Sequence, residues 1–514
     1  MQSLHDKLYG ANDFLIGIEL VSIRGSMAEK SALRARGFAA QLAESSRIDW
    51  ISVTDNAGGN PQLAPQALGK PILYAGKEVV IHLTCKDLNR NGLESAAWQL
   101  QSEGFHNILA MTGDYPLTGN EGMPKPVFDM DSVGLIAMLT KMNNGFADPR
   151  NSTRHEAHLF GKTEFFVGAV TTNYKLLEGE VVPQYLKLRK KVECGAKFII
   201  NQVGYDSQKC RELRLYMDRN GMKEIPLIGN VYILNPKVAR LFHDHRIPGI
   251  VVTRELLDLC LHHASSPDGG KAFFLELAAK QIAVFRHLGY RGAYLGGAYD
   301  YPAIEKILEI ERSFAADDWK QFSAEICFSR PGEFFFYPKE KLYAPSEETL
   351  PTARRHKKDS RFMYRFSRWT HHLVFTQGTV FGRLGAALSR KSRNPAQGPK
   401  ILRTVERASK AFLFKCKDCG DCSLPDIAFL CPESQCAKNQ RNGPCGGTLD
   451  GHCEVEGYGD CIWLRAYDRQ RSENGDMESM LNHAPVVQNQ ALRGTSSWSN
   501  FWLGKDHSAP SRTP

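Results

Sequence analysis

Long apolar runs, a secretory signal and one common nucleotide-binding fingerprint are all missing from this chain of 514 residues. No run of 18 uncharged apolar residues occurs, so we expect no membrane-spanning helix. The first 30 residues lack the charged end, apolar run and small-residue cleavage site of a signal peptide, which predicts a cytoplasmic protein. No G-x-G-x-x-G follows the first apolar strand-like run, so the Rossmann fingerprint is excluded.

Composition predicts a soluble globular protein, with 42% hydrophobic and 24% charged residues and room for two or more domains. The net charge of +9 is uneven, because residues 339–410 hold 17 Lys and Arg against 5 Asp and Glu. Basic residues mixed with aromatics can bind nucleic acid, but we favour a connecting region that docks on a neighbouring domain. The amphipathic stretch 373–390 is likewise expected to pack on protein rather than on a membrane.

Apolar strand-like runs alternate with helix-like segments over the first 310 residues. Short runs rich in Val, Ile, Phe and Leu, each followed by a segment of helical period, indicate a parallel sheet covered by helices. Eight such units in about 300 residues predict a (β/α)8 TIM barrel, with a doubly wound open sheet as the alternative. The predicted strands are 14–20, 50–55, 78–85, 107–114, 165–172, 198–205, 226–234 and 292–298.

Polar residues at the ends of these runs are the first candidates for a site, since barrel active sites lie at the C-terminal ends of the strands. Glu19 is the most unusual of them, because it interrupts an apolar strand and a buried carboxylate costs free energy unless something pairs with it. We therefore suspect Glu19 of proton chemistry, with a surface salt bridge as the alternative. The other candidates are Thr54, Asp55, His82, Thr84, Asp114, Thr171, Thr172 and Gln202.

Cysteine is concentrated near the C-terminus, where eight of the 13 fall within 46 residues. In a reducing cytosol such a cluster indicates metal rather than disulfides, and eight thiolates would fill two four-ligand sites. The opening C-x2-C-x2-C favours at least one [4Fe–4S] cluster, with zinc as the alternative. His452 could also be a ligand but is expected to be exposed. The predicted metal ligands are Cys416, Cys419, Cys422, Cys431, Cys436, Cys445, Cys453 and Cys461.

The strings IELVSIRG, SVTDNAGG, IHLTC, AMTGDYP and LRKKVECGAKFIINQVGYD follow one another within residues 10–312. In order and spacing they resemble the methylenetetrahydrofolate reductase family. The most specific parts are T-G-D at 112–114 and K-V-x-x-G-A-x5-Q at 191–202. The resemblance implies a barrel with a non-covalent flavin, and an oxidoreductase of one-carbon metabolism that reduces 5,10-methylenetetrahydrofolate to 5-methyltetrahydrofolate.

The cysteine segment, over about 412–465, separately resembles the cysteine-rich C-terminal module of that family. The matching strings are CKDCGDCSL, CPESQCAKNQRNGPCGG and GHCEVEGYGDCIW. The module occurs as an extra domain or a partner subunit in acetogen-type bacterial reductases. The predicted organisation is a barrel at 1–312, a basic connecting region at 313–410, a cysteine-rich metal-binding domain at 411–470, and a disordered tail at 471–514.

The resemblance also implies roles for single residues. Glu19 matches the general acid that protonates N10 of the folate, Asp114 matches a carboxylate beside flavin and pterin, and Gln202 matches a pterin contact. Residues matching flavin contacts are Thr54, His82, Met111, Thr112, Gly113, Asp114 and Lys191. The chain departs from a known family member at Thr112, where that protein has an arginine, and at Gln184 and Lys187, which align with its aspartate and asparagine near the adenosine part of FAD.

Those departures leave FAD and FMN both open as cofactors. The implied partners are a tetrahydrofolate substrate and an electron donor, either NAD(P)H or a ferredoxin or partner subunit, and the family implies an oligomer. Neither nucleic acid nor a membrane span is expected. Two other functions remain open: a pterin-binding barrel of a corrinoid methyl-transfer system without flavin, and a non-catalytic electron-transfer subunit.

Overall fold

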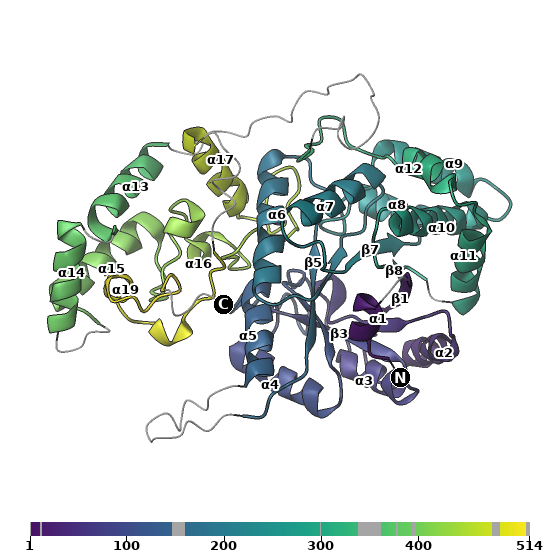
Figure 1. The fold of residues 1–514 in the computed structure, drawn as a ribbon, viewed down its shortest axis with the longest axis horizontal. Helices are drawn as coiled ribbons and strands as arrows, with labels where there is room; N and C mark the ends of the chain where they lie inside the picture. Colours follow the sequence, from purple (N-terminus) through teal and green to yellow (C-terminus); the bar gives the residue numbers. More distant parts are fainter. Residues whose placement is uncertain are drawn as a thin grey trace.

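Eight parallel strands close into a barrel in the order β1 to β8 (Figure 1). The computed structural model describes residues 2–10, 13–145, 160–298, 300–337, 361–376, 379–392, 397–474 and 484–509. The predicted (β/α)8 barrel is confirmed and the open sheet is excluded, because β1 pairs with β8. The strands are β1 (Leu15–Leu20), β2 (Trp50–Val53), β3 (Glu78–Thr84), β4 (Asn107–Met111), β5 (Phe166–Thr171), β6 (Phe198–Asn201), β7 (Leu227–Tyr232) and β8 (Gly292–Gly296).

Helices surround the barrel, and a short helix lies at its N-terminal end. Leu4 and Leu8 of α1 (Leu4–Tyr9) pack with inward-facing barrel residues such as Trp50 and Phe166. The outer helices are α2 (Lys30–Glu44), α3 (Pro65–Tyr74), α4 (Arg90–Ser102), α5 (Ser132–Asn144), α6 (Glu178–Glu193), α7 (Ser207–Arg219), α8 (Pro236–His243), α9 (Arg254–Ala264), α10 (Lys271–His287) and α11 (Tyr301–Ser313).

Glycines opposite large rings explain how the barrel interior is filled. A Cβ on Gly17 would lie 1.9 Å from the ring of Trp50, its register partner on β2. A Cβ on Gly168 would lie 2.1 Å from Phe198, its partner on β6. Each ring thus fills the space beside the glycine on the neighbouring strand, and the barrel interior below the rim is densely packed.

Packing onto the barrel continues beyond residue 312, where we placed the domain boundary. The helix α12 (Asp318–Glu325) follows α11, and its Phe322 packs with residues of α10. Phe334 joins the main barrel core, and Glu212 of α7 accepts a hydrogen bond from the backbone of Phe336 at 2.5 Å. The start of the predicted connecting region therefore covers the outside of the barrel.

The C-terminal region forms a second packed unit beside α6 (Figure 1). Its core joins Tyr364 to Ile427 and Leu430 from the cysteine segment and to Ile462 and Trp463. The basic helices and the cysteine segment therefore share one core, although we predicted a boundary between them at 410. The helices are α13 (Arg361–Phe375), α14 (Val380–Lys391), α15 (Lys400–Phe414), α16 (Pro432–Gln435), α17 (Ile462–Asn474) and α19 (Ser497–Trp502).

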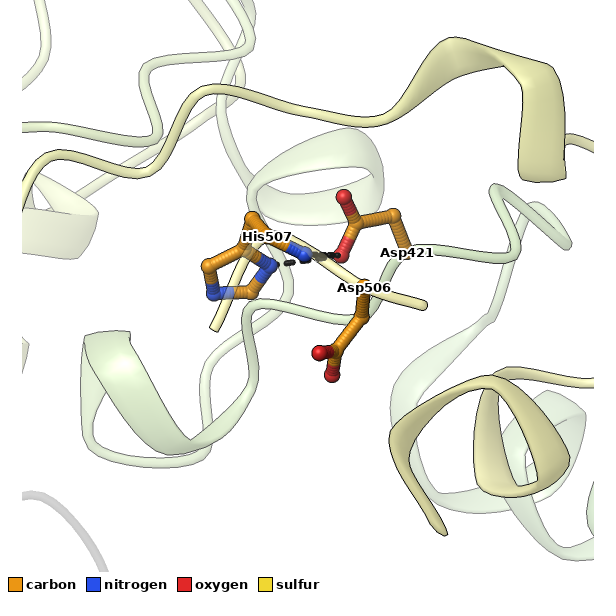
Figure 2. Close-up of side chains that lie close together, drawn as sticks. All are labelled: Asp421, Asp506 and His507. Atoms are coloured by element: carbon orange, nitrogen blue, oxygen red, sulfur yellow. Dashed lines mark hydrogen bonds and ion pairs between the residues drawn. The ribbon is translucent and has the colours of Figure 1, made fainter. Parts of the chain in front are cut away.

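The tail, which we expected to be disordered, is packed where the structure describes it, at 484–509. Asp421 is fully buried and accepts hydrogen bonds from the backbone N–H of Asn489 at 2.6 Å and from His507 (Figure 2). His507 Nδ1 lies 2.5 Å from Asp421, and its Nε2 lies 3.1 Å from Asp426. Burial opposes protonation of His507, but the two carboxylates outweigh it and raise its pKa to about 10. An ion-paired imidazolium thus holds the end of the tail.

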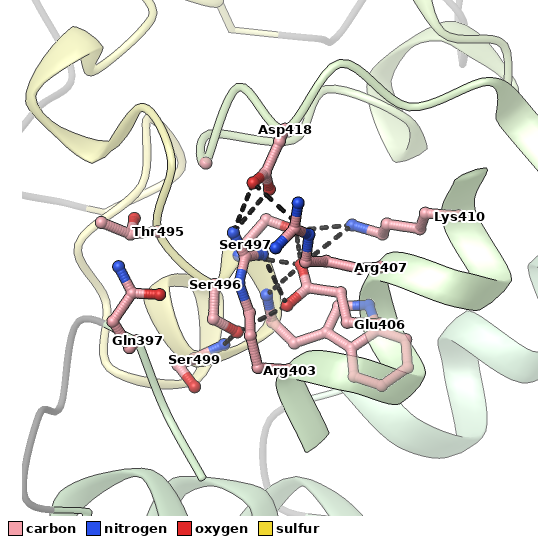
Figure 3. Close-up of polar contacts among 12 residues, drawn as sticks. Gln397, Arg403, Glu406, Arg407, Lys410, Asp418, Thr495, Ser496, Ser497 and Ser499 are labelled. Atoms are coloured by element: carbon pink, nitrogen blue, oxygen red, sulfur yellow. Dashed lines mark hydrogen bonds and ion pairs between the residues drawn. The ribbon is translucent and has the colours of Figure 1, made fainter. Parts of the chain in front are cut away.

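A second buried carboxylate holds the start of α19. Glu406 of α15 accepts hydrogen bonds from Ser496 Oγ at 2.6 Å and from Ser497 N and Oγ at 2.9 and 2.6 Å (Figure 3). Trp502 stacks on Phe375 with ring centroids 5.3 Å apart. The composition rich in Ser and Asn suggested disorder because it offers little apolar surface, yet these groups dock by bonding buried acids. The remaining residues of the tail lie outside the described ranges.

No helix in the described part of the chain has the length and apolar character needed to cross a bilayer, as the sequence predicted.

Candidate functional site

A cavity of about 1290 Å³, mouth included, opens at the C-terminal ends of the barrel strands. It gathers every barrel residue that the sequence singled out, although these come from four strands (β1, β3, β4 and β5), from the loops after β2, β4, β5 and β6, and from α6. The predicted residues in its wall are Glu19, Thr54, His82, Met111, Thr112, Gly113, Asp114, Lys191 and Gln202, together with Asp55, Thr84, Thr171 and Thr172. Glu19 and Asp114 therefore face one common space.

Glu19 lies near the end of β1 with its carboxylate in this cavity. Burial raises its pKa to about 7, and the hydroxyl of Tyr294, which donates to Oε1 at 3.5 Å, lowers it only in part. A carboxyl group with this pKa is partly protonated at neutral pH, so Glu19 can donate a proton where an ordinary glutamate cannot.

His82 on β3 and Tyr294 on β8 lie beside Glu19. His82 is 5% exposed, and burial lowers its pKa to about 4, so the ring is neutral at neutral pH. The Tyr294 hydroxyl lies 3.4 Å from His82 Nε2 and so connects the histidine to the acid. Sequence analysis did not find Tyr294, because a tyrosine inside an apolar strand reads as core and β8 is far from β1 in sequence.

Asp114 follows β4 in a loop fixed by a neighbouring loop. Its Oδ2 accepts a hydrogen bond from the backbone N–H of Gly58 at 2.8 Å. Gly113, at φ +86°, allows the tight approach, since a Cβ there would lie 2.9 Å from Thr84 Cβ. The T-G-D block thus belongs to a loop after the strand, although we predicted a strand to 114.

Two lysines of α6 reach the cavity from its side. Lys187 and Lys191 are 2% and 5% exposed, and burial lowers the pKa of both ammonium groups. Lys191 donates to the carbonyl of Val170, and Lys187 donates to Gln440 Oε1 at 2.7 Å and Pro444 O at 3.1 Å. Lys187, noted as a departure from the family, therefore binds the cysteine-rich segment.

A loop of the cysteine-rich segment closes one side of the cavity. Lys438 donates to the carbonyl of Gly113 at 2.9 Å and pairs with Glu454 at 2.6 Å. Asp131, buried at the start of α5, accepts hydrogen bonds from the backbone N–H groups of Arg441 and Asn442 at 3.1 and 3.0 Å. From this segment the cavity is lined by Lys438, Pro444, Cys445, Gly446, Gly447 and Glu454. No sequence pattern pointed to these contacts, because they join segments 300 residues apart.

All thirteen cysteines are free thiols, and the eight predicted ligands fall into two sets of four. Burial raises the pKa of Cys416, Cys419 and Cys431, and the nearby thiol of Cys422 raises each of them further, which identifies the first set. The second set lines a cavity of about 400 Å³ and comprises Cys436, Cys445, Cys453 and Cys461. This is the arrangement that two four-ligand sites require.

The spacing of the sulfurs is wider than a zinc site needs. With Zn–S bonds of about 2.3 Å, tetrahedral thiolates lie about 3.8 Å apart. Among the described residues, no three cysteine sulfurs lie within 4.8 Å of one another; the one close trio is Asp421, Asp506 and His507. Both nitrogens of that histidine already meet carboxylates, which makes the trio an ion-pair network. His452, with a side chain 61% exposed, pairs with Asp460 at 3.0 Å.

Cys445 lies in the wall of both cavities. Burial raises the pKa of its thiol, and Lys438 and Lys187 lower it by their positive charge. The same lysines contact the barrel rim and the loop that carries Cys445. The second cysteine set is thus separated from the barrel cavity by the thickness of one residue.

Comparison with known proteins gives matches in both units. The model described as "Methylenetetrahydrofolate reductase" matches residues 30–242, and the one described as "Methylene-tetrahydrofolate reductase C terminal" matches residues 397–490. The first begins after Glu19, so the match of that residue rests on the sequence resemblance alone.

Two curated relatives match part of the barrel. "Methylenetetrahydrofolate reductase 2" of Schizosaccharomyces pombe is 24% identical over 151 residues, which are 29% of this chain and 22% of the relative. The protein of the same name from Saccharomyces cerevisiae is 24% identical over 173 residues, 32% and 26% of the two chains. The match thus spans about a quarter of each relative's length.

Two solved structures are similar at low scores. One is an uncharacterized protein from Clostridium thermocellum that binds two copies of 5-methyl-5,6,7,8-tetrahydrofolic acid, at 11% identity and a TM-score of 0.44, over 60% of this chain and 97% of that one. The other is 2,3-dimethylmalate lyase, at 14% identity and a TM-score of 0.33, over 64% and 95% of the two chains.

The two family models match in order along one chain, the first over most of the barrel and the second over the unit that closes its cavity. Residues 30–242 and 397–490 of this chain are therefore two domains of the methylenetetrahydrofolate reductase family.

Proposed function

We propose that this protein catalyses the flavin-dependent reduction of 5,10-methylenetetrahydrofolate to 5-methyltetrahydrofolate. The observation that carries the proposal is a glutamate with a pKa of about 7 in a cavity that it shares with Asp114 and two buried lysines. Membership of the family supports an oxidoreductase acting on this folate.

The chain's own residues supply the acid and the charge stabilisation. Glu19 transfers its proton to N10 of the folate, which opens the five-membered ring and leaves a positive charge on the carbon-bearing nitrogen N5. Asp114, held by the Gly58 backbone, stabilises that charge. Tyr294 keeps Glu19 oriented, and Gln202 in the cavity wall is placed to bond the pterin.

The donor groups of the cavity fit a flavin. Thr171 Oγ1, Thr172 Oγ1 and Gln184 Nε2 are buried in its wall and have no partner within the protein. Such atoms need a bound molecule or water to satisfy them. Lys191 is suited to hold a phosphate as a point charge. A bound flavin supplies the hydride that reduces the folate carbon.

FMN fits this cavity better than FAD. The resemblance places the adenosine part of FAD at Gln184 and Lys187. Here Lys187 donates to the carbonyls of Gly443 and Pro444. The cysteine-rich segment therefore occupies that side of the cavity, which favours the smaller cofactor.

The eight thiols fit two iron–sulfur clusters, because they form two sets of four and the first set opens with C-x2-C-x2-C. Such clusters carry single electrons, which favours a ferredoxin or a partner subunit as the donor over NAD(P)H. Cys445 places the second set next to the barrel cavity.

The test is anaerobic purification of the whole chain. We expect a coloured protein that releases FMN, contains iron and sulfide, and oxidises 5-methyltetrahydrofolate with an artificial acceptor. A protein that binds tetrahydrofolate but no flavin would contradict the proposal and favour the methyl-transfer alternative. Zinc without iron would contradict the cluster assignment alone.

A further inference from the structure

The helices α13 to α15 expose large apolar side chains at the end of the molecule away from the barrel (Figure 1). Phe362 and Trp369 of α13 are 75% and 63% exposed, Val380 of α14 is 79% exposed, and Ile401 and Phe412 of α15 are 80% and 88% exposed. Phe362 and Trp369 are seven residues apart and Ile401 and Phe412 eleven, so each pair shares one helix face. An apolar surface of this kind indicates an interaction site.

The charged side chains of the three helices themselves are nearly all positive, while Asp418 pairs with Arg403 and Arg407 and Asp506 lines the neighbouring groove. Residues 361–415 contain 12 Lys and Arg and a single acid, Glu406, which is buried under α19. Arg383 and Arg390 of α14 and Lys400 and Arg407 of α15 are exposed. These three helices therefore present no acidic side chain of their own to a partner.

An apolar groove lies between α13, α15 and α19, with a volume of about 1020 Å³, mouth included. Phe366 of α13 and Val405 of α15 line it and are themselves 46% and 51% exposed. Phe375 and Trp498 line it farther in. The exposed faces of α13 and α15 thus meet at a groove wide enough to receive an apolar chain.

We propose that the α13–α15 surface docks on an anionic lipid bilayer, with its helices lying in the plane of the headgroups. Helices with aromatic and aliphatic side chains on one face and Lys and Arg beside them bind in this way. The 15 residues of α15 span about 22 Å, less than the hydrocarbon thickness of about 30 Å, so this helix can lie on a membrane but not cross it.

Other occupants suit the surface less well. Nucleic acid would pair with the positive charges, but the apolar side chains of Ile401 and Phe412 would then lie against charged phosphate groups. A second copy of the chain would bring two cationic surfaces together. We expected the stretch 373–390 to pack on protein, and one face of α14 does so, since Gly385 lies against Trp502. The opposite face, with Val380, is the exposed one.

Flotation of the full-length protein with vesicles tests the proposal. We expect binding to vesicles of phosphatidylcholine with one-quarter phosphatidylglycerol, weak binding to phosphatidylcholine alone, and loss of binding in 0.5 M salt. Absence of binding to anionic vesicles, or equal binding to both kinds, would overturn the proposal.

Two pairs of substitutions separate the apolar and electrostatic contributions. Ile401→Ser with Phe412→Ser should abolish flotation, whereas Tyr74→Ser, at a barrel tyrosine that is 75% exposed, should not. Arg383→Gln with Arg390→Gln should weaken binding to anionic vesicles about thirtyfold, at about fivefold for each charge.

Arg34→Gln with Arg36→Gln on α2 is the matched charge control, with no expected loss. Near-UV circular dichroism establishes that each variant is folded, and light scattering gives its mass. A dimer that the serine pair dissociates, or flotation that the serine pair leaves unchanged, would overturn the proposal in favour of another occupant or another surface.

Discussion

Replacing Glu19 by Gln should make the stability of the protein less dependent on pH. The pKa of Glu19 rises from 4.5 to about 7 because burial disfavours the charged form. At about 1.4 kcal/mol per pKa unit, ionising this side chain costs the folded state as much as about 3 kcal/mol. Between pH 4.5 and 7 the folded state holds a proton that the unfolded state has lost, so stability falls as pH rises through this window.

Glutamine keeps the shape of the side chain but cannot ionise. The free energy of unfolding of Glu19→Gln should therefore match that of the native protein at pH 4.5 and exceed it by up to about 3 kcal/mol at pH 8. Urea denaturation followed by circular dichroism at these two pH values measures the difference. The matched control is Glu29→Gln at an exposed position, for which the difference should stay constant.

The Glu19→Gln variant also distinguishes the proposed proton transfer to the folate from reduction of the flavin. Turnover of 5-methyltetrahydrofolate should be lost, whereas chemical reduction of the bound flavin by dithionite should remain, because the proposed role of Glu19 is to protonate the folate. A stability difference that does not change between pH 4.5 and 8 would refute the desolvation of Glu19. Folate turnover at the native rate would refute its role as the acid.

Three further variants test other parts of the structure. Cys445→Ser should lower the iron content by about half while leaving the first cysteine set loaded, as measured by metal analysis of protein purified anaerobically. Lys191→Met should weaken FMN binding by about tenfold or more in a fluorescence titration, because the proposed phosphate contact of Lys191 is lost. Glu406→Gln should cost about 3 kcal/mol and make the tail susceptible to limited proteolysis, because Ser496 and Ser497 lose a charged acceptor.

The barrel could be predicted from the sequence because its signal is local. Each strand is an apolar run that periodicity identifies, and β1 (Leu15–Leu20) lies within the predicted 14–20. The ends were less accurate: β6 (Phe198–Asn201) is half as long as the predicted 198–205. The residues after Asn201 turn away into the loop that carries Gln202, where hydrogen bonding to the next strand has already ended.

Some site residues could likewise be predicted from local sequence signals, and others could not. Glu19, His82 and Asp114 could be found because they lie near or just after the C-terminal ends of strands, and a closed barrel brings all these ends to one rim. Lys438 and Glu454 could not be found, because they reach the rim from a unit folded around its own core. Periodicity shows which side chains are buried, but not which distant segments meet.

The loop that joins the two units contains two glycines, Gly443 and Gly446, at positions where a side chain would be crowded. Gly443, at φ +145°, has no side chain where a Cβ would lie 2.6 Å from Lys187 Cβ, and a Cβ on Gly446, at φ +96°, would lie 3.3 Å from Thr172 Cγ2. These glycines let the backbone enter the rim and carry Cys445 to the shared wall. Because Cys445 belongs both to the second cysteine set and to the barrel cavity, a metal bound there would fix one wall of that cavity. Loss of that metal should therefore loosen the cavity itself.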